Sequence, residues 1–199
     1  DWISAGEKLS LVLSNGSLLQ GQETADQGRP RITAETWALE VTSSDTLSIG
    51  SDAIPFVIEV DELRLDVESG NKPVHAVIED LSGLTITQMT VSALGDVTLS
   101  ARDDLAYDAK TQSTVGSGHL TLESRAGDLS LLGDLTLDKS GLSVIASGDI
   151  YQAGASQVST TGGDITFLAG GGFYQSLNGS LEASDPMAQI AVIAQAGDV

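Results

Sequence analysis

The chain has 199 residues, no cysteine and a formal net charge of −19 from 28 acidic and 9 basic residues. The missing cysteine excludes disulfides, thiolate catalysis and cysteine-based zinc sites. The charge disfavours nucleic acid and anionic membranes, since no lysine and arginine cluster offsets it. It is compatible with Ca²⁺, basic proteins or neutral glycans as partners, although solubility in a salty medium is the simpler explanation.

The hydrophobic composition bounds the core. Hydrophobic residues make up 41% of the chain and aromatic residues only 4%, so we expect a core of aliphatic side chains. No apolar run reaches the ~20 residues of a transmembrane helix, and we therefore expect no membrane insertion.

Residues 1–90 contain short apolar alternations at irregular spacing. An apolar residue at every second position is typical of a strand with one buried face. The starts of these segments are 28, 26 and 21 residues apart; the segments are 9–13, 37–41, 63–67 and 84–86. The longer spacing predicts protruding loops, for which the candidates are 20–31, 43–52 and 69–73.

Residues 91–199 repeat the same alternation more regularly. Five stretches begin 23, 22, 23 and 25 residues apart, at 97–101, 120–124, 142–146, 165–169 and 190–194. A fixed period in this range indicates a solenoid in which each repeat stacks on the last. The fifth position is always small, as a narrowing interior or a bend in the coil would require.

Each repeat continues with two further short strands. An apolar residue follows eight or nine positions after each start, and a third run, such as 135–137 or 157–159, follows in most repeats. Recurring Gly-Asp pairs provide the corners, because glycine permits positive φ and aspartate bonds its own backbone. The pattern predicts an all-β parallel β-helix of about 8–9 coils of roughly 22–26 residues, forming one segment over 1–199 and a rod of roughly 40 Å.

A family resemblance adds to this reading. The segment 47–56, leading into Val60-Asp61-Glu62-Leu63, and the Gly-Asp-Ile/Val units at 95–99 and 163–167 resemble filamentous-haemagglutinin-like repeats. Similar stretches occur in giant LEPR-XLL-type proteins. The resemblance implies a right-handed β-helix, secretion to a bacterial cell surface, and a role in adhesion or as a stalk. It supplies no catalytic residues.

Aspartates form the best-defined polar column. Asp104, Asp128, Asp149 and Asp198 each precede a second strand, while Gly172 interrupts the series. Carboxylates stacked near ~5 Å would repel one another unless they were solvated or shared a cation. A calcium ladder is one interpretation; solvated corner residues are the interpretation we favour. The calcium nonapeptide repeat is missing, so we expect no calcium β-roll.

Other polar groups offer little for catalysis. Arg102, Asp103 and Asp104 meet beside a predicted strand, and polysaccharide-cleaving β-helices use clustered aspartates or calcium with arginine. These acids are adjacent in sequence and no cationic groove accompanies them, so we expect a solvated turn. His75 and His119 are expected to face solvent, and the sequence shows no acid–base partner for either. The sequence therefore predicts no enzyme and no required cofactor.

Aromatic residues give a sugar-binding hypothesis. By the period, Tyr151 and Tyr174 point outward at matching positions, where they are able to stack against sugar rings. Phe173 points inward, and Gln152 and Gln175 are expected to form an inward amide ladder. Ordinary aromatic cover of a strand face is the competing interpretation of the two tyrosines.

These observations predict a structural or adhesive segment of a large secreted bacterial surface protein, cut from a longer repetitive chain. Its partners would be glycans or proteins on host or neighbouring cells. Unpaired strand edges at both ends favour end-to-end self-association of the isolated piece. The alternatives are a carbohydrate-active β-helix protein, such as a polysaccharide lyase or hydrolase, and a glycan-binding module.

Overall fold

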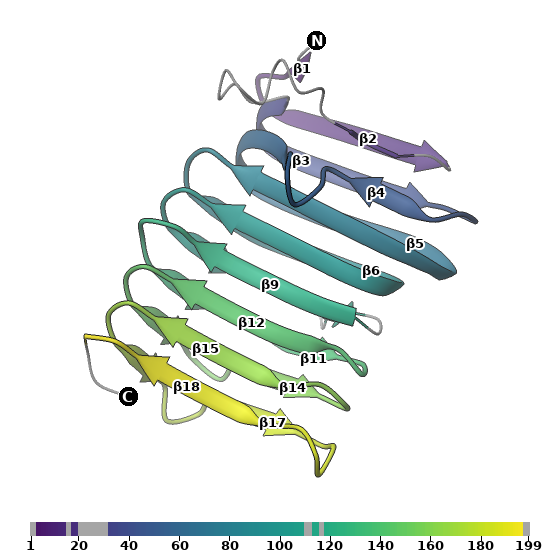
Figure 1. Ribbon diagram of the computed structural model, residues 1–199. Coiled ribbons are helices and arrows are strands. Elements are labelled where there is room, and N and C mark those ends of the chain that lie inside the picture. Colours follow the sequence, from purple (N-terminus) through teal and green to yellow (C-terminus); the bar gives the residue numbers. More distant parts are fainter. Residues whose placement is uncertain (1–2, 15–16, 20–31, 110–112, 116–117, 197–199) are drawn as a thin grey trace.

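The computed structural model describes residues 3–14, 17–19, 32–109, 113–115 and 118–196. Within these ranges the chain forms 18 strands and no helix, and every pairing between strands is parallel. Figure 1 shows the strands stacked as a solenoid from the N-terminus to the C-terminus. No helix able to cross a membrane is present in this part of the chain.

The strands lie on three faces that meet at corners. Face A carries the five repeated stretches, the first of which is the end of β6 (Leu84–Ala101). Its separate strands are β4 (Leu47–Ile49), β9 (Gly118–Ser124), β12 (Gly141–Ala146), β15 (Ile165–Ala169) and β18 (Ile190–Ala194). Face B contains β7 (Leu105–Tyr107), β10 (Leu129–Leu131), β13 (Ile150–Gln152) and β16 (Phe173–Gln175). Face C contains β8 (Ser113–Val115), β11 (Leu135–Leu137), β14 (Gln157–Thr160) and β17 (Ser180–Ala183).

The repeat alignment is confirmed residue for residue on face A. Leu99 pairs with Leu122, Leu122 with Val144, Val144 with Phe167, and Phe167 with Val192. The second and third predicted strands of each repeat are also present, on faces B and C. The prediction of an all-β parallel β-helix is therefore confirmed.

The N-terminal half is built from longer strands. These are β1 (Ile3–Ser4), β2 (Lys8–Ser14), β3 (Ile32–Thr42), β5 (Phe56–Asp80) and β6 (Leu84–Ala101). Segments 9–13, 37–41 and 63–67 stack on one another through Leu11, Leu39 and Leu65. They run from the edge of face B into face C, and not along face A. Segment 84–86 pairs with β7 on face B.

The predicted loop over 43–52 is wrong in part. Within 43–52, strand β4 occupies face A, with Leu47 and Ile49 fully buried and Ile49 paired with Ala76. The protrusion predicted at 69–73 corresponds to a bulge inside β5: Glu68 pairs with Ser92 and Pro73 with Leu94, so residues 69–72 stand opposite residue 93 alone. The third candidate loop, 20–31, lies outside the described residues.

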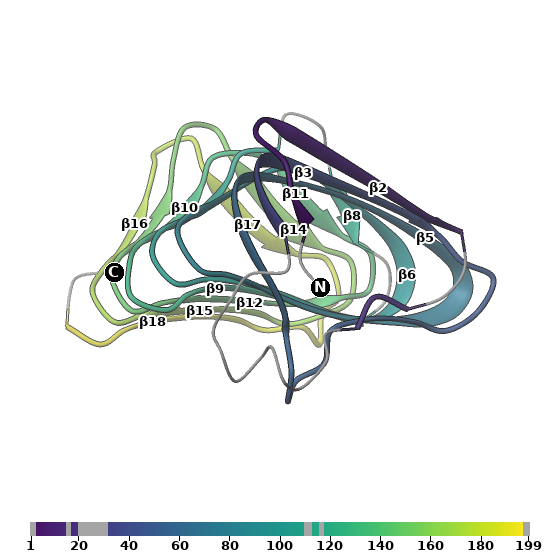
Figure 2. The ribbon, with the colours of Figure 1, turned by 90° about the horizontal axis from the view of Figure 1, so that it is seen from above.

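The coil count is lower than predicted, with about seven turns in place of eight or nine. The reason is the greater length of the first coils: Leu9 pairs with Trp37 and Trp37 with Leu63, which lie 28 and 26 residues apart, against 22 to 25 residues in the regular part. Viewed down the axis, the N-terminal and C-terminal coils are displaced laterally from one another (Figure 2).

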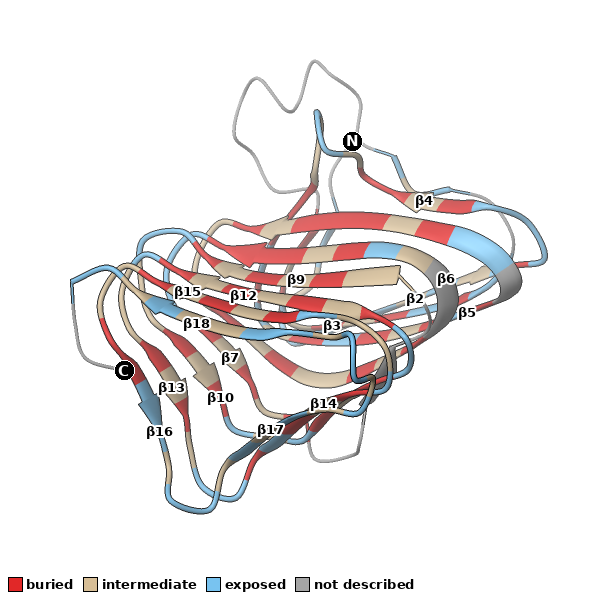
Figure 3. Ribbon diagram, turned by 60° about the horizontal axis from the view of Figure 1, so that its bottom comes forward, coloured by how far each residue is buried: buried red, intermediate tan, exposed pale blue. Residues whose placement is uncertain are grey.

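The core is a continuous aliphatic column. Inward residues alternate with outward ones along each strand (Figure 3), and the leucines of β9, β10 and β11 are fully buried. Burying each such side chain contributes about 1.5–3 kcal/mol. The largest buried aromatic side chains are Trp37, Tyr107 and Phe167, and each is fully buried. Stacking coils thus shields apolar surface that no single coil is able to bury alone.

Candidate functional site

The aspartate column lies at the corner between faces A and B, which we call the AB corner (residues 102–104, 125–128, 147–149 and 170–172). The N–H of Asp128 donates to Asp104 Oδ1 at 2.8 Å, and the N–H of Asp149 donates to Asp128 Oδ1 at 2.8 Å. The N–H of Gly172 donates to Asp149 Oδ1 at 2.7 Å. Each carboxylate is therefore satisfied by the backbone of the next coil.

This arrangement explains the Gly-Asp pairs at 127–128 and 148–149. A Cβ at Gly127 would collide with Asp104 Oδ1, and one at Gly148 would collide with Asp128 Oδ1. The carboxylate reaches the following N–H only because the preceding residue has no side chain. The glycine thus serves the close approach of two coils, in addition to the turn that the sequence suggests.

Tyr174 accounts for the interruption at Gly172. A Cβ at Gly172 would lie 2.8 Å from both Cζ and Oη of Tyr174, so the tyrosine ring fills the space of a side chain there. Gly172 still donates its N–H to Asp149 and closes the series. That bond and the hydroxyl of Tyr151 hold the pKa of Asp149 below its usual value.

Calcium binding at this column stays a prediction. Among the described residues, no group of three or more histidine, aspartate or glutamate side chains lies close enough together to hold a metal ion. Asp104, Asp128 and Asp149 lie one coil apart and use one oxygen each on a backbone N–H. Asp198 lies outside the described residues.

Tyr151 and Tyr174 form a stacked pair on face B. Their ring centroids are 5.3 Å apart with an interplanar angle of 16°, and Tyr174 is 46% exposed. Both side chains point outward, as the period predicts, while Phe173 is buried. The Tyr151 hydroxyl donates to Asp149 Oδ2 at 2.8 Å, and this bond is the main cause that raises the pKa of Tyr151 to about 12.

The predicted amide contact is present, although only Gln152 is buried and Gln175 is exposed. Gln152 is 1% exposed and donates from Nε2 to the carbonyls of Ser156 and Ser180 at 2.8 and 2.9 Å. Gln175 Nε2 donates to Gln152 Oε1 at 3.0 Å. The amides replace the leucine that occupies this position in β10 and link faces B and C in the last coils.

A hollow of about 340 Å³ opens beside Tyr151 on face B. Its floor is formed by the outward residues Thr85, Ala106 and Ser130, which lie in register with the tyrosine. Gly83, Asp104 and Asp128 bound it along the AB corner. The hollow combines an aromatic wall, a small polar floor and an acidic rim.

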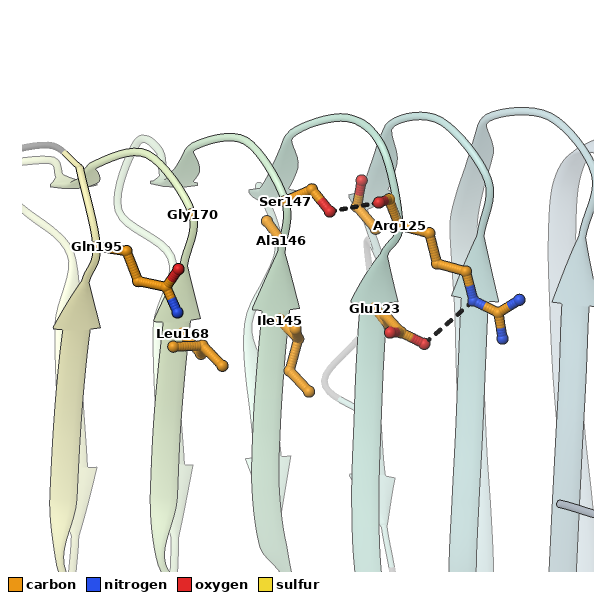
Figure 4. A pocket seen from close by; sticks show the side chains of 9 residues that line it. Glu123, Arg125, Ile145, Ala146, Ser147, Leu168, Gly170 and Gln195 are labelled. Atoms are coloured by element: carbon orange, nitrogen blue, oxygen red, sulfur yellow. Dashed lines mark hydrogen bonds and ion pairs between the residues drawn. The ribbon is translucent and has the colours of Figure 1, made fainter.

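A second hollow lies on face A (Figure 4). Ile145 and Leu168 stand in one outward column with Glu123, and Gln195 lies at the C-terminal end. Arg125 Nη1 lies 2.5 Å from Glu79 Oε1, and Arg125 Nε lies 3.4 Å from Glu123 Oε2. The result is an apolar strip beside an exposed ion pair, which offers a contact surface more than an enclosed ligand site.

The arginine turn is as expected, whereas the two histidines have polar neighbours. Arg102, Asp103 and Asp104 are exposed. His119 is half-buried, with Nε2 at 2.8 Å from Ser143 Oγ. His75 does have an acidic neighbour, since its Nε2 lies 3.4 Å from Asp52 Oδ1. That neighbour comes from the segment that sequence analysis assigned to a loop.

Asp80 is a polar residue that the sequence analysis missed. It is 0% exposed and pairs in register with Ala101, in the column of small inward residues. Its Oδ2 accepts the Val60 N–H at 2.8 Å; its Oδ1 accepts the Ser82 N–H at 2.7 Å and the Ser82 hydroxyl at 2.9 Å. Burial raises the pKa of this carboxyl.

Comparison of the chain with protein-family models, with curated proteins and with solved structures found no match.

Proposed function

We propose that this chain is a structural and adhesive segment of a large secreted bacterial cell-surface protein. The observation that carries the proposal is the continuous parallel stack, in which successive coils pair on faces A, B and C. Such a stack forms a stiff rod without a flexible joint, because each coil is fixed to the next by backbone hydrogen bonds and a shared core. The filamentous-haemagglutinin-like phrases in the sequence support the same conclusion.

The acidic surface is consistent with this role. The net charge of −19 keeps the rod apart from other polyanions and soluble at high local density. The outward columns on faces A and B then provide the lateral contact surfaces, and the core provides stiffness. Function in this proposal is physical, and no bond of a substrate is broken.

Antibody labelling of intact cells that produce the protein tests the proposal. Antibodies raised against the folded chain should label the cells without permeabilisation, while a cytoplasmic marker stays unlabelled. Labelling that requires permeabilisation would contradict a surface role. Release of products from a polysaccharide panel would contradict the non-catalytic part and favour the carbohydrate-active alternative.

Self-association belongs to the same proposal. Ile190 and Ile193 in β18 are 42% and 50% exposed, and β18 pairs only with β15 within the described residues. An open strand edge next to exposed aliphatic residues favours addition of another strand. Light scattering should show the weight-average mass rising with concentration, and a constant monomer mass at high concentration would contradict this.

A further inference from the structure

The outward column of face B changes abruptly in size along the rod. From the N-terminal side it reads Thr85, Ala106, Ser130, Tyr151 and Tyr174, and these residues pair in register one after another. Strands β7, β10, β13 and β16 lie in this order (Figure 3). Three small residues therefore meet two large rings, and the change leaves a step at Tyr151.

The two rings have different surroundings at this step. Tyr174 stacks on Tyr151 at a centroid distance of 5.3 Å and covers its C-terminal side. Tyr151 lines the hollow with Ser130 and Ala106, and Tyr174 does not. One face of Tyr151 is thus the wall of the hollow, while the other is occupied by its neighbour.

The wall is held in place before any ligand arrives. The Tyr151 hydroxyl donates to Asp149 Oδ2 at 2.8 Å, Asp149 Oδ1 is bound by the Gly172 N–H, and Tyr174 packs over Gly172. A ring fixed by stacking and by a hydrogen bond loses little further freedom on binding, which lowers the entropic cost.

The rim supplies acceptors. Oδ1 of Asp104 and Oδ1 of Asp128 each accept a hydrogen bond from a backbone N–H of the next coil. Among the described residues, neither Oδ2 atom accepts a hydrogen bond. A ligand with several hydroxyl donors fits this rim, and a ligand with its own negative charge is repelled by it. The volume of about 340 Å³ lies within the usual range for ligand pockets, ~300–1,000 Å³.

We propose that this step is a binding site for one neutral pyranose ring of a glycan. The C–H face of the sugar would lie on the free face of Tyr151, since polarised C–H groups are attracted to the negative face of an aromatic ring. Its hydroxyls would donate to Asp104 and Asp128, and Ser130 and Ala106 would form the floor. This inference rests on the adhesive part of the proposed function and names its ligand class.

Saturation-transfer NMR on the intact chain tests the site. The probes are the methyl glycosides of glucose, galactose, mannose and N-acetylglucosamine, with methyl glucuronide as the charged comparison. At least one neutral glycoside should show saturation transfer concentrated on the C–H protons of one ring face, and the glucuronide should show none. Absence of transfer to all the neutral sugars would overturn the proposal.

Three variants locate the binding. Ser130→Leu fills the floor, and Tyr151→Ala removes the wall, so each should weaken the affinity of the bound sugar at least about tenfold. Thr121→Leu makes the same kind of outward change on face A and should leave the affinity unchanged. Far-UV circular dichroism and the melting temperature establish that each variant is folded; Ser130→Leu remains decisive if Tyr151→Ala unfolds.

The outcomes separate this site from the broader proposal. Binding that survives Ser130→Leu, or preferential binding of the glucuronide, would overturn the site. Surface labelling of intact cells does not depend on any of these variants. A protein that labels at the surface but binds no neutral sugar would keep its structural role and lose this site.

Discussion

At the scale of single residues, Asp80 shows how a charged group is accommodated in an aliphatic interior. Three hydrogen bonds from Val60 and Ser82 satisfy a carboxylate that is 0% exposed. Asp80→Ala leaves the two backbone N–H groups without this acceptor, and each buried unsatisfied group costs about 1–3 kcal/mol. We expect a matching loss in the free energy of unfolding, measured with denaturant; Ser130→Ala, an outward change, should cost far less.

The protonation of Asp80 gives a pH dependence with a defined sign. Burial raises its folded-state pKa above 3.8, so the folded state binds the proton more tightly than the unfolded state does. As pH falls through the raised pKa toward 3.8, the wild type should gain stability relative to Asp80→Asn. The measurement is the difference in unfolding free energy between the two proteins. A difference that moves the other way on acidification contradicts this assignment.

Glycine at a close contact gives a second prediction at this scale. A Cβ at Gly163 would collide with the carbonyl of Ser140 in the preceding coil, whereas nothing lies within 4 Å of a Cβ at Gly6. Gly163→Ala should lower the free energy of unfolding by about 1–3 kcal/mol, because the corner must move apart. Gly6→Ala is the matched control, and equal effects of the two changes would show that coil spacing is not the cause.

At the scale of elements, the AB corner joins consecutive coils through aspartate side chains. Asp128→Ala removes the acceptor for the Asp149 N–H and should destabilise the chain by about 1 kcal/mol. The effect should be local, so amide hydrogen exchange at Asp149 should accelerate most. Asp103→Ala changes an exposed acid of the same corner and should leave exchange at Asp149 unaltered. Unchanged protection at Asp149 in Asp128→Ala would show that the bond is unimportant.

At the scale of the whole molecule, the charge of −19 opposes a compact rod. Salt shortens the Debye length from ~30 Å at 0.01 M to ~3 Å at 1 M and screens this repulsion. The melting temperature should therefore rise with added NaCl. Calcium chloride at equal ionic strength separates screening from binding: a larger rise with calcium would support the predicted calcium site, and an equal rise would count against it.

The sequence predicts the fold well where one repeat resembles the next. Pairing of Leu99, Leu122, Val144 and Phe167 follows from the period alone. It predicts the N-terminal half poorly, because alternation is the same on every face and does not say which face a strand occupies. Strand β4 was missed for a second reason: its two inward residues, Leu47 and Ile49, make too short an alternation to distinguish from a loop.

The sequence predicts which side chains point outward, but it does not predict their hydrogen-bond partners. The period places Tyr151 and Tyr174 outward, and the structure confirms that. The bonds of Asp104, Asp128 and Asp149 were not predictable, because each reaches a backbone donor one coil later. The small residues Ala106 and Ser130 draw no attention in a sequence, yet they create the step beside Tyr151.

The register across β9, β12 and β15 also bears on how such chains change length during evolution. Leu142 occupies the place that Ile165 takes one coil later, so removing 142–164 would bring Ile165 beside Leu120. Asp128 would then face the N–H of Gly172, next to a Gly171 that already lacks a Cβ. Unequal recombination between repeats is therefore able to insert or delete a whole coil while the cross-section stays intact. The length of the rod then changes in steps of about 4.8 Å, on which selection acts.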